Sequence, residues 1–236
     1  MLKDYVCVDL ETTSGNPQWG RIIEIGAVKV RDGKVVEEFS ELVNPECSVP
    51  DMITDLTGIS TEMVSSKETI EVILPRFLEF AADDVLLGHN LNFDYSFLKQ
   101  NANDLKLDFE KKGIDTLYIA RKKLRSLESR GLEFLCNYFG INDPNHHRAF
   151  NDASVTSHLY LILCDMFKDD ENIFEPKELK YRPRKKQPIT PKQARFLKNL
   201  IEYHNIEVDY EIEKLTKSEA SRHIDQIISE KGRILY

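Results

Sequence analysis

Residues 21–43, RIIEIGAVKVRDGKVVEEFSELV, place the strongest constraint on what this chain can fold into. Two runs rich in β-branched residues flank the pair Asp32-Gly33, and such a pair favours the tight turn of a two-stranded hairpin. The run 4–10 that precedes them also has the composition of a buried strand. The chain is therefore expected to open with three antiparallel strands.

The segments that follow alternate between helical and strand patterns. Apolar residues at helical spacing predict a helix over about 68–82, and VLLGHN at 85–90 is a short apolar run that ends in polar residues. A strand that follows a helical crossover is normally parallel to the strand before it. A helix from about Asp94, a fifth strand at the start of KGIDTLYIA and two later amphipathic helices complete the pattern. The predicted fold class is α/β, with a mixed five-stranded sheet flanked by helices.

Composition limits the classes of protein to which the chain can belong. Its 236 residues are 41% hydrophobic and 31% charged, which suits one medium domain with a small appendage. No segment approaches the roughly 20 uninterrupted apolar residues of a membrane span, and Lys3 and Asp4 stand where a signal peptide would be apolar. We expect a cytoplasmic protein with no membrane partner, whose four widely spaced cysteines stay reduced.

The charge is distributed unevenly along the chain. The net charge is −8, yet residues 177–198 carry nine basic side chains and one acidic one, whereas residues 1–176 sum to −13 and residues 199–236 to −3. A basic segment attached to an acidic body is typical of a protein with a polyanionic partner. A plain solvated linker is the alternative.

Composition also divides the chain into parts. The Pro- and Lys-rich stretch 173–188 predicts an extended linker between a domain over 1–172 and a small helical module over 189–236. In that module, Thr190 to Gln193 and Thr216 to Glu219 both fit the capping box that starts a helix. Each predicted helix carries one apolar face, so the module is expected to consist of two packed helices.

Four acids stand at positions that the predicted topology brings together. Asp9 and Glu11, two residues apart in the first strand, point to one face near its carboxyl end. Asp94 follows the fourth strand, and Asp152 opens a late helix. Such an all-oxygen cluster needs cations to remain ionised, and it suits Mg²⁺ or Mn²⁺ better than zinc. Two such ions about 3.5 to 4 Å apart are a common arrangement for phosphodiester hydrolysis.

Three short segments carry a family resemblance. In order, VDLETT (8–13), GHNLNFDYSFL (88–98) and HHRAFNDA (146–153) resemble the three motifs of the DEDDh, or DnaQ-like, 3′→5′ exonucleases. That family includes the proofreading epsilon subunit of bacterial replicative DNA polymerase. The connecting segments are similar too, so the resemblance covers about residues 4–168. It implies an RNase H-like fold and an enzyme that releases 5′-mononucleotides from a free 3′ end.

The resemblance implies a role for each of five residues. Asp9, Glu11 and Asp152 match the acids that hold a first divalent cation. Asp9 also bridges to a second cation, and Asp94 matches the acid that completes the site. His147, five residues before Asp152, matches the histidine that takes a proton from the attacking water. The implied cofactors are two divalent cations, Mg²⁺ or Mn²⁺.

Other residues are candidates for supporting roles. A sister subfamily has a tyrosine four residues before the last acid, and Arg148 stands there in this chain, which favours the DEDDh assignment. Phe93 and Phe97 are expected to lie in the core, and His146 to be a solvated neighbour of the catalytic histidine. The resemblance implies that five residues of the family's substrate loops contact the terminal nucleotide: Thr12, Thr13, Gly58, Ile59 and Asn90. Local structural roles for these residues are the alternative.

The sequence leaves the substrate and the partners open. Single-stranded or frayed DNA is the leading substrate. An RNA-directed 3′→5′ exoribonuclease or oligoribonuclease of the same fold is the alternative, because no residue that reads the 2′-hydroxyl is recognisable. A catalytically degenerate nucleic-acid-binding module is disfavoured because it has no need of four acids and a histidine. The C-terminal module is a candidate docking site for a polymerase or another protein. Candidate phosphate contacts in the linker are Arg182, Arg184, Lys185 and Lys186.

Overall fold

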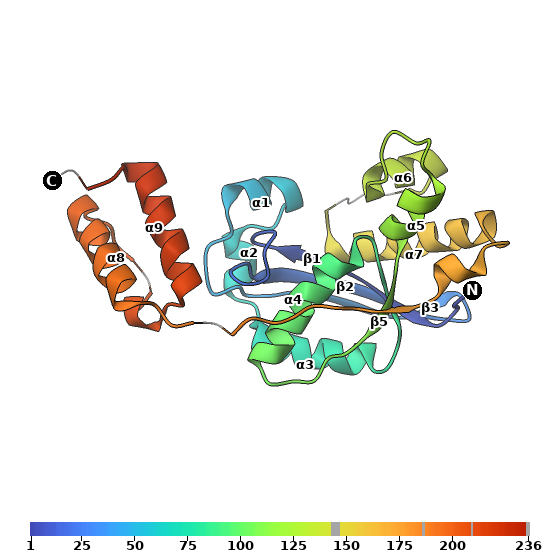
Figure 1. Cartoon of the computed structure of the whole chain (residues 1–236), viewed down its shortest axis with the longest axis horizontal. Coiled ribbons are helices and arrows are strands. Elements are labelled where there is room, and N and C mark those ends of the chain that lie inside the picture. Colours follow the sequence, from blue (N-terminus) through green and yellow to red (C-terminus); the bar gives the residue numbers. More distant parts are fainter. Residues whose placement is uncertain (143–146, 186, 209, 235–236) are drawn as a thin grey trace. The chain divides into compact units, whose positions relative to one another are not determined.

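The computed structural model describes the whole chain except residues 143–146, 186, 209 and 235–236. The chain divides into two compact units, Met1–Pro183 and Arg184–Tyr236 (Figure 1). Among the described residues, no helix combines the length and the apolar character that crossing a membrane requires.

The first unit is built on a mixed sheet with the strand order β3-β2-β1-β4-β5-β6. β1, β2 and β3 pair antiparallel, β4 and β5 continue parallel to β1, and β6 returns antiparallel to β5. The strands are β1 (Tyr5–Thr12), β2 (Ile22–Arg31), β3 (Lys34–Leu42), β4 (Leu86–Gly88), β5 (Lys112–Asp115) and β6 (Lys177–Glu178). The predicted mixed α/β fold is confirmed, with one strand more than predicted. Strand β6 was not predicted because it is two residues long and lies in a Lys- and Pro-rich stretch.

The opening strands form for the reasons expected from the sequence. Asp32 and Gly33 have φ angles of 50° and 74°, and the mirror-image hairpin turn needs positive φ at both positions. In β1, Val6 and Val8 belong to one core cluster, whereas Cys7 belongs to a second. A strand covered on both faces requires a continuous apolar run, which this segment supplies.

Helices cover both faces of the sheet (Figure 1). The side chains of α3 and α4 pack with Val6 and Val8, and those of α5, α6 and α7 pack with Tyr5 and Cys7 on the other face. The bounds are α3 (Ile70–Ala81), α4 (Leu91–Asp104), α5 (Thr116–Lys123), α6 (Leu132–Phe139), α7 (Ala149–Met166) and η1 (Glu171–Phe174). The helix predicted from about Asp94 thus begins at Leu91.

Two short helices, α1 (Asp51–Thr57) and α2 (Thr61–Ser65), were not predicted. Helices of seven and five residues are too short to show an apolar period, so the sequence indicated only a connection. Their region is held by a small satellite cluster that includes Ile23, Ile59 and Val64.

The first unit extends past the predicted domain boundary at residue 172. Phe174 is buried, and its ring meets that of Tyr160 edge-on at 6.0 Å between centroids. The backbone N–H of Leu179 donates to the carbonyl of Lys111 at 2.9 Å, and Tyr181 lies against the same core. The first part of the predicted linker therefore packs on the sheet, and the two units separate after Pro183.

The second unit contains α8 (Pro191–His204), η2 (Ile212–Lys214) and α9 (Lys217–Lys231). Both predicted capping boxes are present, and the Thr190 and Thr216 hydroxyls each accept a hydrogen bond from a backbone N–H of the first helical turn. Leu197 and Leu200 of α8 pack with isoleucines of α9 in one cluster. The second unit therefore consists of two packed helices joined by a segment that contains η2.

Candidate active site

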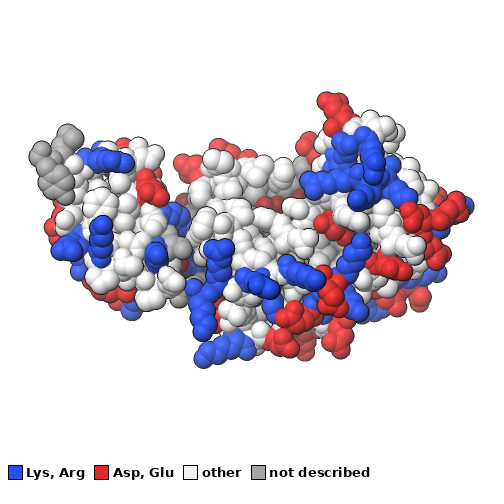
Figure 2. Space-filling model, in the orientation of Figure 1, with Lys and Arg blue, Asp and Glu red and all other residues white. Residues whose placement is uncertain are grey.

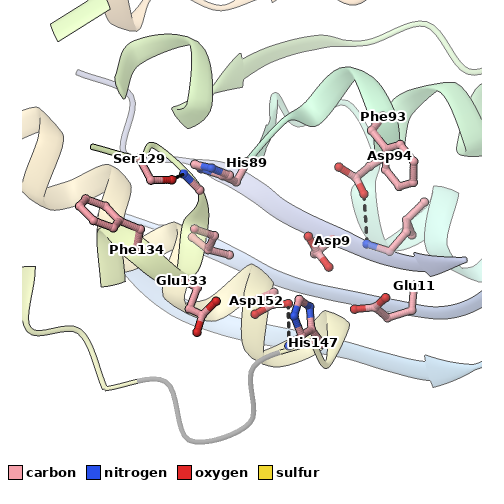
Figure 3. Close-up of a pocket in the computed structure, with 13 residues that line it drawn as sticks. Asp9, Glu11, His89, Phe93, Asp94, Ser129, Glu133, Phe134, His147 and Asp152 are labelled. Atoms are coloured by element: carbon pink, nitrogen blue, oxygen red, sulfur yellow. Dashed lines mark hydrogen bonds between the residues drawn. The ribbon is translucent and has the colours of Figure 1, made fainter. Parts of the chain in front are cut away.

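Strand β1 carries two acids to the floor of a cavity of about 410 Å³. Asp9 pairs with Gly26 of β2, and Glu11 pairs with Glu24, so the two acids lie on one face near the carboxyl end of β1. Figure 3 shows both side chains in the cavity. Their position follows directly from the two-residue period of a strand.

Helix α4 brings a third acid to the same place. Asp94 lies in the first turn of α4 and is 2% exposed. Its Oδ1 accepts a hydrogen bond of 3.1 Å from the backbone N–H of Leu10, which lies between the two acids of β1 (Figure 3). This bond joins α4 to β1 and fixes the carboxylate beside Asp9.

Helix α7 supplies the opposite side of the cavity. Asp152, in its first turn, is buried, and its Oδ2 accepts a hydrogen bond of 3.2 Å from the backbone N–H of His147. His147 precedes the helix with a φ of 64°, an uncommon conformation for a residue with a side chain. A carboxylate oxygen of Glu11, a ring nitrogen of His147 and a carboxylate oxygen of Asp152 lie within 4.8 Å of one another, close enough to bind one metal ion. Figure 3 shows the His147 ring between the two carboxylates.

An ion pair between a buried glutamate and a partly exposed arginine attaches the start of α7 to the sheet. Glu24 is 1% exposed, and its Oε1 accepts from Arg148 Nη2 at 2.6 Å, while Arg148 Nε lies 3.2 Å from both carboxylate oxygens. Glu24 Oε2 also accepts from the backbone N–H of Ala149 at 2.9 Å. The sequence marked Arg148 only as the residue in place of a tyrosine, because nothing in the order of residues reveals a contact with Glu24.

Gly26 lets α7 approach the sheet closely. A Cβ atom at this position would overlap the backbone of Ala149 and Phe150 at the start of the helix. Glu24 and Gly26, two residues apart on β2, therefore anchor the same turn of α7. That turn carries His147 at its beginning and Asp152 at its end.

Burial raises the pKa of the acids of β1 and α4, and neighbouring carboxylates raise it further. Burial raises the pKa of Asp9 well above its ordinary range, and the charges of Asp94, Asp152 and Glu11 raise it further. Burial also raises the pKa of Asp94, against the hydrogen bonds that it accepts from backbone N–H groups, including that of Leu10. The protonated forms are favoured because several partly or fully buried carboxylates converge.

Glu11 shows the same effect with a partial compensation. Burial, followed by the charges of Asp152 and Glu24, raises the pKa of Glu11 to about 8, while Arg148 acts in the opposite direction. Arg148 is already bound to Glu24, so it neutralises the cluster only in part. A converging set of carboxylates with this deficit of positive charge suits divalent cations with oxygen ligands.

The remaining cavity wall was not predicted. It includes His89 and Phe93 on the side of α4, and Ser129, Glu133 and Phe134 around the start of α6 (Figure 3). Phe97 is fully buried as expected, whereas Phe93 is partly exposed in the cavity. The positions of Ser129 and Phe134 depend on how the chain crosses the sheet, which no local signal encodes.

Three expected substrate contacts lie at the ends of β1 and β4. Thr12 and Thr13 are buried, and their hydroxyls bond to the backbone at Ser14 and Arg21. Asn90 is exposed and caps α4 with a φ of 69°. Among the described residues, the cavity lining includes none of these three side chains.

The other expected substrate contacts lie after α1. Gly58 ends α1 with a φ of 72°, and Ile59 is fully buried in the satellite cluster, so both hold local structural positions. In the predicted linker, Arg182, Arg184 and Lys185 are exposed. Lys186 and His146 lie outside the described residues.

Comparison with known families agrees with this arrangement. Residues 6–160 match the RNase T family, whose members are described as exonucleases. The chain belongs to this exonuclease family. The exonuclease is of the DEDD 3′→5′ class, and its motifs are those of the DnaQ-like members.

Relatives of the exonuclease include a PolC-type DNA polymerase III of Clostridium perfringens, which is 38% identical over 176 residues. That match covers 75% of this chain and 12% of the relative, so the chain spans only a small part of the longer protein.

Two solved structures share the fold of the exonuclease. Exonuclease X in complex with 5′ overhanging duplex DNA is 25% identical with a TM-score of 0.56, and the match covers 70% of this chain and 93% of that chain. Exonuclease I of E. coli in complex with a dT13 oligonucleotide is 18% identical with a TM-score of 0.63, over 73% of this chain and 43% of that one.

Proposed function

We propose that the chain hydrolyses phosphodiester bonds from a free 3′ end of DNA, single-stranded or frayed, and releases 5′-mononucleotides. The observation that carries this proposal is the convergence of four acids and a histidine in one cavity: Asp9, Glu11, Asp94, His147 and Asp152. Exonuclease X and Exonuclease I, which share the fold, were solved with DNA, and this supports DNA as the substrate.

The acid cluster is proposed to hold two divalent cations, Mg²⁺ or Mn²⁺. The raised pKa values of Asp9 and Glu11 support this, because such carboxylates gain stability when positive charge is placed between them. When bound, such cations stabilise the charge that develops on the phosphate oxygens and lower the pKa of a water molecule. Glu11 and Asp152 each place a carboxylate oxygen within 4.8 Å of a ring nitrogen of His147.

His147 is proposed to accept the proton of the attacking water on a ring nitrogen. Its backbone N–H donates to Asp152, and a ring nitrogen lies within 4.8 Å of an oxygen of Glu11 and of Asp152. General base catalysis of this kind contributes about 10²- to 10⁴-fold to a rate.

The rest of the cavity is proposed to hold the terminal nucleotide. Its volume of about 410 Å³ lies in the range of small-molecule sites, roughly 300 to 1,000 Å³. Phe93 and Phe134 offer aromatic faces in its wall. The five expected substrate contacts are retained as proposals that act through backbone groups: Thr12, Thr13, Asn90, Gly58 and Ile59. The side chains of Thr12, Thr13 and Ile59 are engaged locally, Gly58 has no side chain, and that of Asn90 is exposed.

Partners beyond the substrate are proposed for the second part of the chain. The exposed Arg182, Arg184 and Lys185 are candidate phosphate contacts, and the two-helix unit is a candidate docking site for a polymerase or another protein. Truncation after Pro183, where the first unit ends, removes Arg184, Lys185 and the two-helix unit but keeps Arg182 and the residues of the cavity. A smaller salt dependence of DNA affinity in the truncated chain would support phosphate contacts.

The proposal is tested by digestion of matched single-stranded DNA, double-stranded DNA and RNA, each labelled at the 5′ end. With Mg²⁺ or Mn²⁺ we expect a ladder of products shortened from the 3′ end and free 5′-mononucleotides, and no reaction in excess chelator. If RNA is digested faster than DNA, RNA replaces DNA as the proposed substrate. Cleavage in excess chelator, or internal cuts, would contradict the proposal.

A further inference from the structure

Helix α5 and the loop after it form a basic segment in an acidic unit. Residues 116–130 carry five basic side chains and one acidic one, whereas residues 1–176 as a whole sum to −13. Figure 2 shows Lys and Arg gathered at the upper right, in the region where Figure 1 places α5 and α6. We name Arg121, Lys122 and Arg125 the α5 patch.

The α5 patch borders the wall of the cavity. The loop that follows α5 contributes Ser129 and Gly131 to the cavity lining. His89, another lining residue, bonds through Nε2 to the carbonyl of Arg130 at 2.9 Å, so the loop is tied to the wall. Burial lowers the pKa of His89, whereas the charge of Asp115 and the hydrogen bond to Arg130 raise it, and the charge of Arg121 adds a smaller lowering effect.

The side chains of the α5 patch are available to a ligand. Arg121, Lys122 and Arg125 are exposed, and no ion pair between described residues engages them. Lys123 differs, because it pairs with Asp170. Charges at the end of a helix also stabilise its dipole, but Arg125 lies beyond the last residue of α5, so that role does not account for it.

An exposed aromatic ring adjoins the α5 patch. Tyr118 is 42% exposed, and the ammonium groups of Lys122 and Lys177 lie 5.7 and 4.7 Å from its ring centre. A flat ring among cations is the combination with which proteins hold single-stranded nucleic acid, because bases stack while phosphates meet positive charge.

We propose that the α5 patch binds the backbone of single-stranded DNA upstream of the 3′-terminal nucleotide. This inference rests on the proposed function, since it requires the 3′ end to occupy the cavity. The strand leaves the cavity past the loop of Ser129 and Gly131, and its phosphates meet Arg121 and Arg125. Substrates too short to reach the α5 patch gain nothing from it.

The test compares three full-length proteins. Arg121→Ala/Arg125→Ala removes two charges from the α5 patch. Lys3→Ala/Lys34→Ala removes two exposed charges at the end of the sheet opposite to Glu11 and is the matched control. The affinity for a 12-nucleotide single strand is measured against salt concentration with Ca²⁺ in place of Mg²⁺.

We expect the log–log slope of the Arg121/Arg125 variant to be shallower by about 1.4, which is about 0.7 for each lost phosphate contact. The control keeps the wild-type slope. With Mg²⁺, the ratio of kcat/KM for the 12-nucleotide strand to that for a dinucleotide falls in the variant at low salt. Arg121→Lys/Arg125→Lys, which keeps both charges, retains most of the slope.

Equal slopes for wild type and the Arg121/Arg125 variant would overturn the inference. So would an equal loss of kcat/KM on the two substrate lengths, because that indicates a disturbed cavity. Failure of the proposed function is distinguishable, since the wild-type protein would then cleave neither substrate with Mg²⁺.

Discussion

The two sides of the cavity are built in different ways. Asp9, Glu11 and Asp94 are placed by neighbouring elements, through the strand period of β1 and one hydrogen bond from Leu10 to α4. His147 and Asp152 are instead placed by a turn of α7 that is anchored on β2, more than 100 residues away in the chain. The two acids of β1 are placed by the local strand period and Asp94 by one long-range hydrogen bond, whereas His147 and Asp152 both depend on the anchoring of α7 on β2.

This difference separates two kinds of failure. Changes on the β1 side alter the charge of the site without moving its frame. Changes at the anchor of α7 move His147 and Asp152 together while the other acids stay in place. The predictions below use this distinction.

The largest effect is expected for Asp9→Ala. Loss of a central carboxylate should reduce kcat by about 10⁴-fold or more, since each tenfold corresponds to about 1.4 kcal/mol of transition-state stabilisation. Without divalent cations the variant should melt at a higher temperature than wild type, because one of several repelling acids is gone. Steady-state kinetics and thermal melts in chelator measure the two effects. A variant that keeps a tenth of the wild-type rate would show that the site is misplaced.

A smaller loss is expected for His147→Ala. The variant should lose about 10²- to 10⁴-fold in kcat with KM nearly unchanged, since the histidine acts on a proton and not on the phosphate. Its pH–rate profile should lose the limb that belongs to the general base. An unchanged profile would assign the proton transfer to another group. His158, which is exposed on α7, provides the matched control as His158→Ala.

A still smaller effect is expected for Glu24→Gln, which tests the α7 side alone. The ion pair to Arg148 is lost while the shape is kept, so His147 and Asp152 should shift together and kcat should fall by roughly 10- to 100-fold, as for partners that orient metal ligands. Glu38→Gln, an exposed change on β3, is the control. A fall in kcat equal to that of Asp9→Ala would mean that the two sides are not independent.

The smallest effect concerns stability and pH on the β1 side. The pKa of Glu11 is about 8 in the folded chain against an ordinary 4.5, so the folded state holds the proton more tightly. The stability that this contributes is fully present below pH 4.5 and is lost as the pH rises through about 8. In chelator, the melting temperature should therefore fall between pH 5 and 8, and Glu11→Gln should show less of this fall. Added Mg²⁺ should raise melting more at pH 8 than at pH 5.

Much of the first unit follows from local sequence patterns. The Asp32-Gly33 turn, the double-sided burial of β1 and the acids two residues apart all depend on neighbours in the chain. Both capping boxes of the second unit are local in the same sense. For these features the residue types alone select the backbone conformation.

The parts that the sequence did not predict depend on distant contacts. Glu24 appears in sequence as one polar residue within an apolar strand, and its partner Arg148 becomes visible only when α7 lies on β2. Strand β6 exists because the chain after Phe174 returns to pair with β5. The cavity wall at Ser129 and Phe134 is likewise set by the crossing of the chain over the sheet.

The hairpin turn at Asp32-Gly33 has a practical consequence for single-molecule work. Tyr5 pairs with Val30 beside this turn, whereas Glu11 pairs at the other end of the ladder, and six residues of strand separate the two ends by about 20 Å. A dye or a surface tether attached beside the turn would therefore lie away from the cavity. An exonuclease immobilised in this way leaves its active site open to a long strand, so its digestion could be followed one nucleotide at a time.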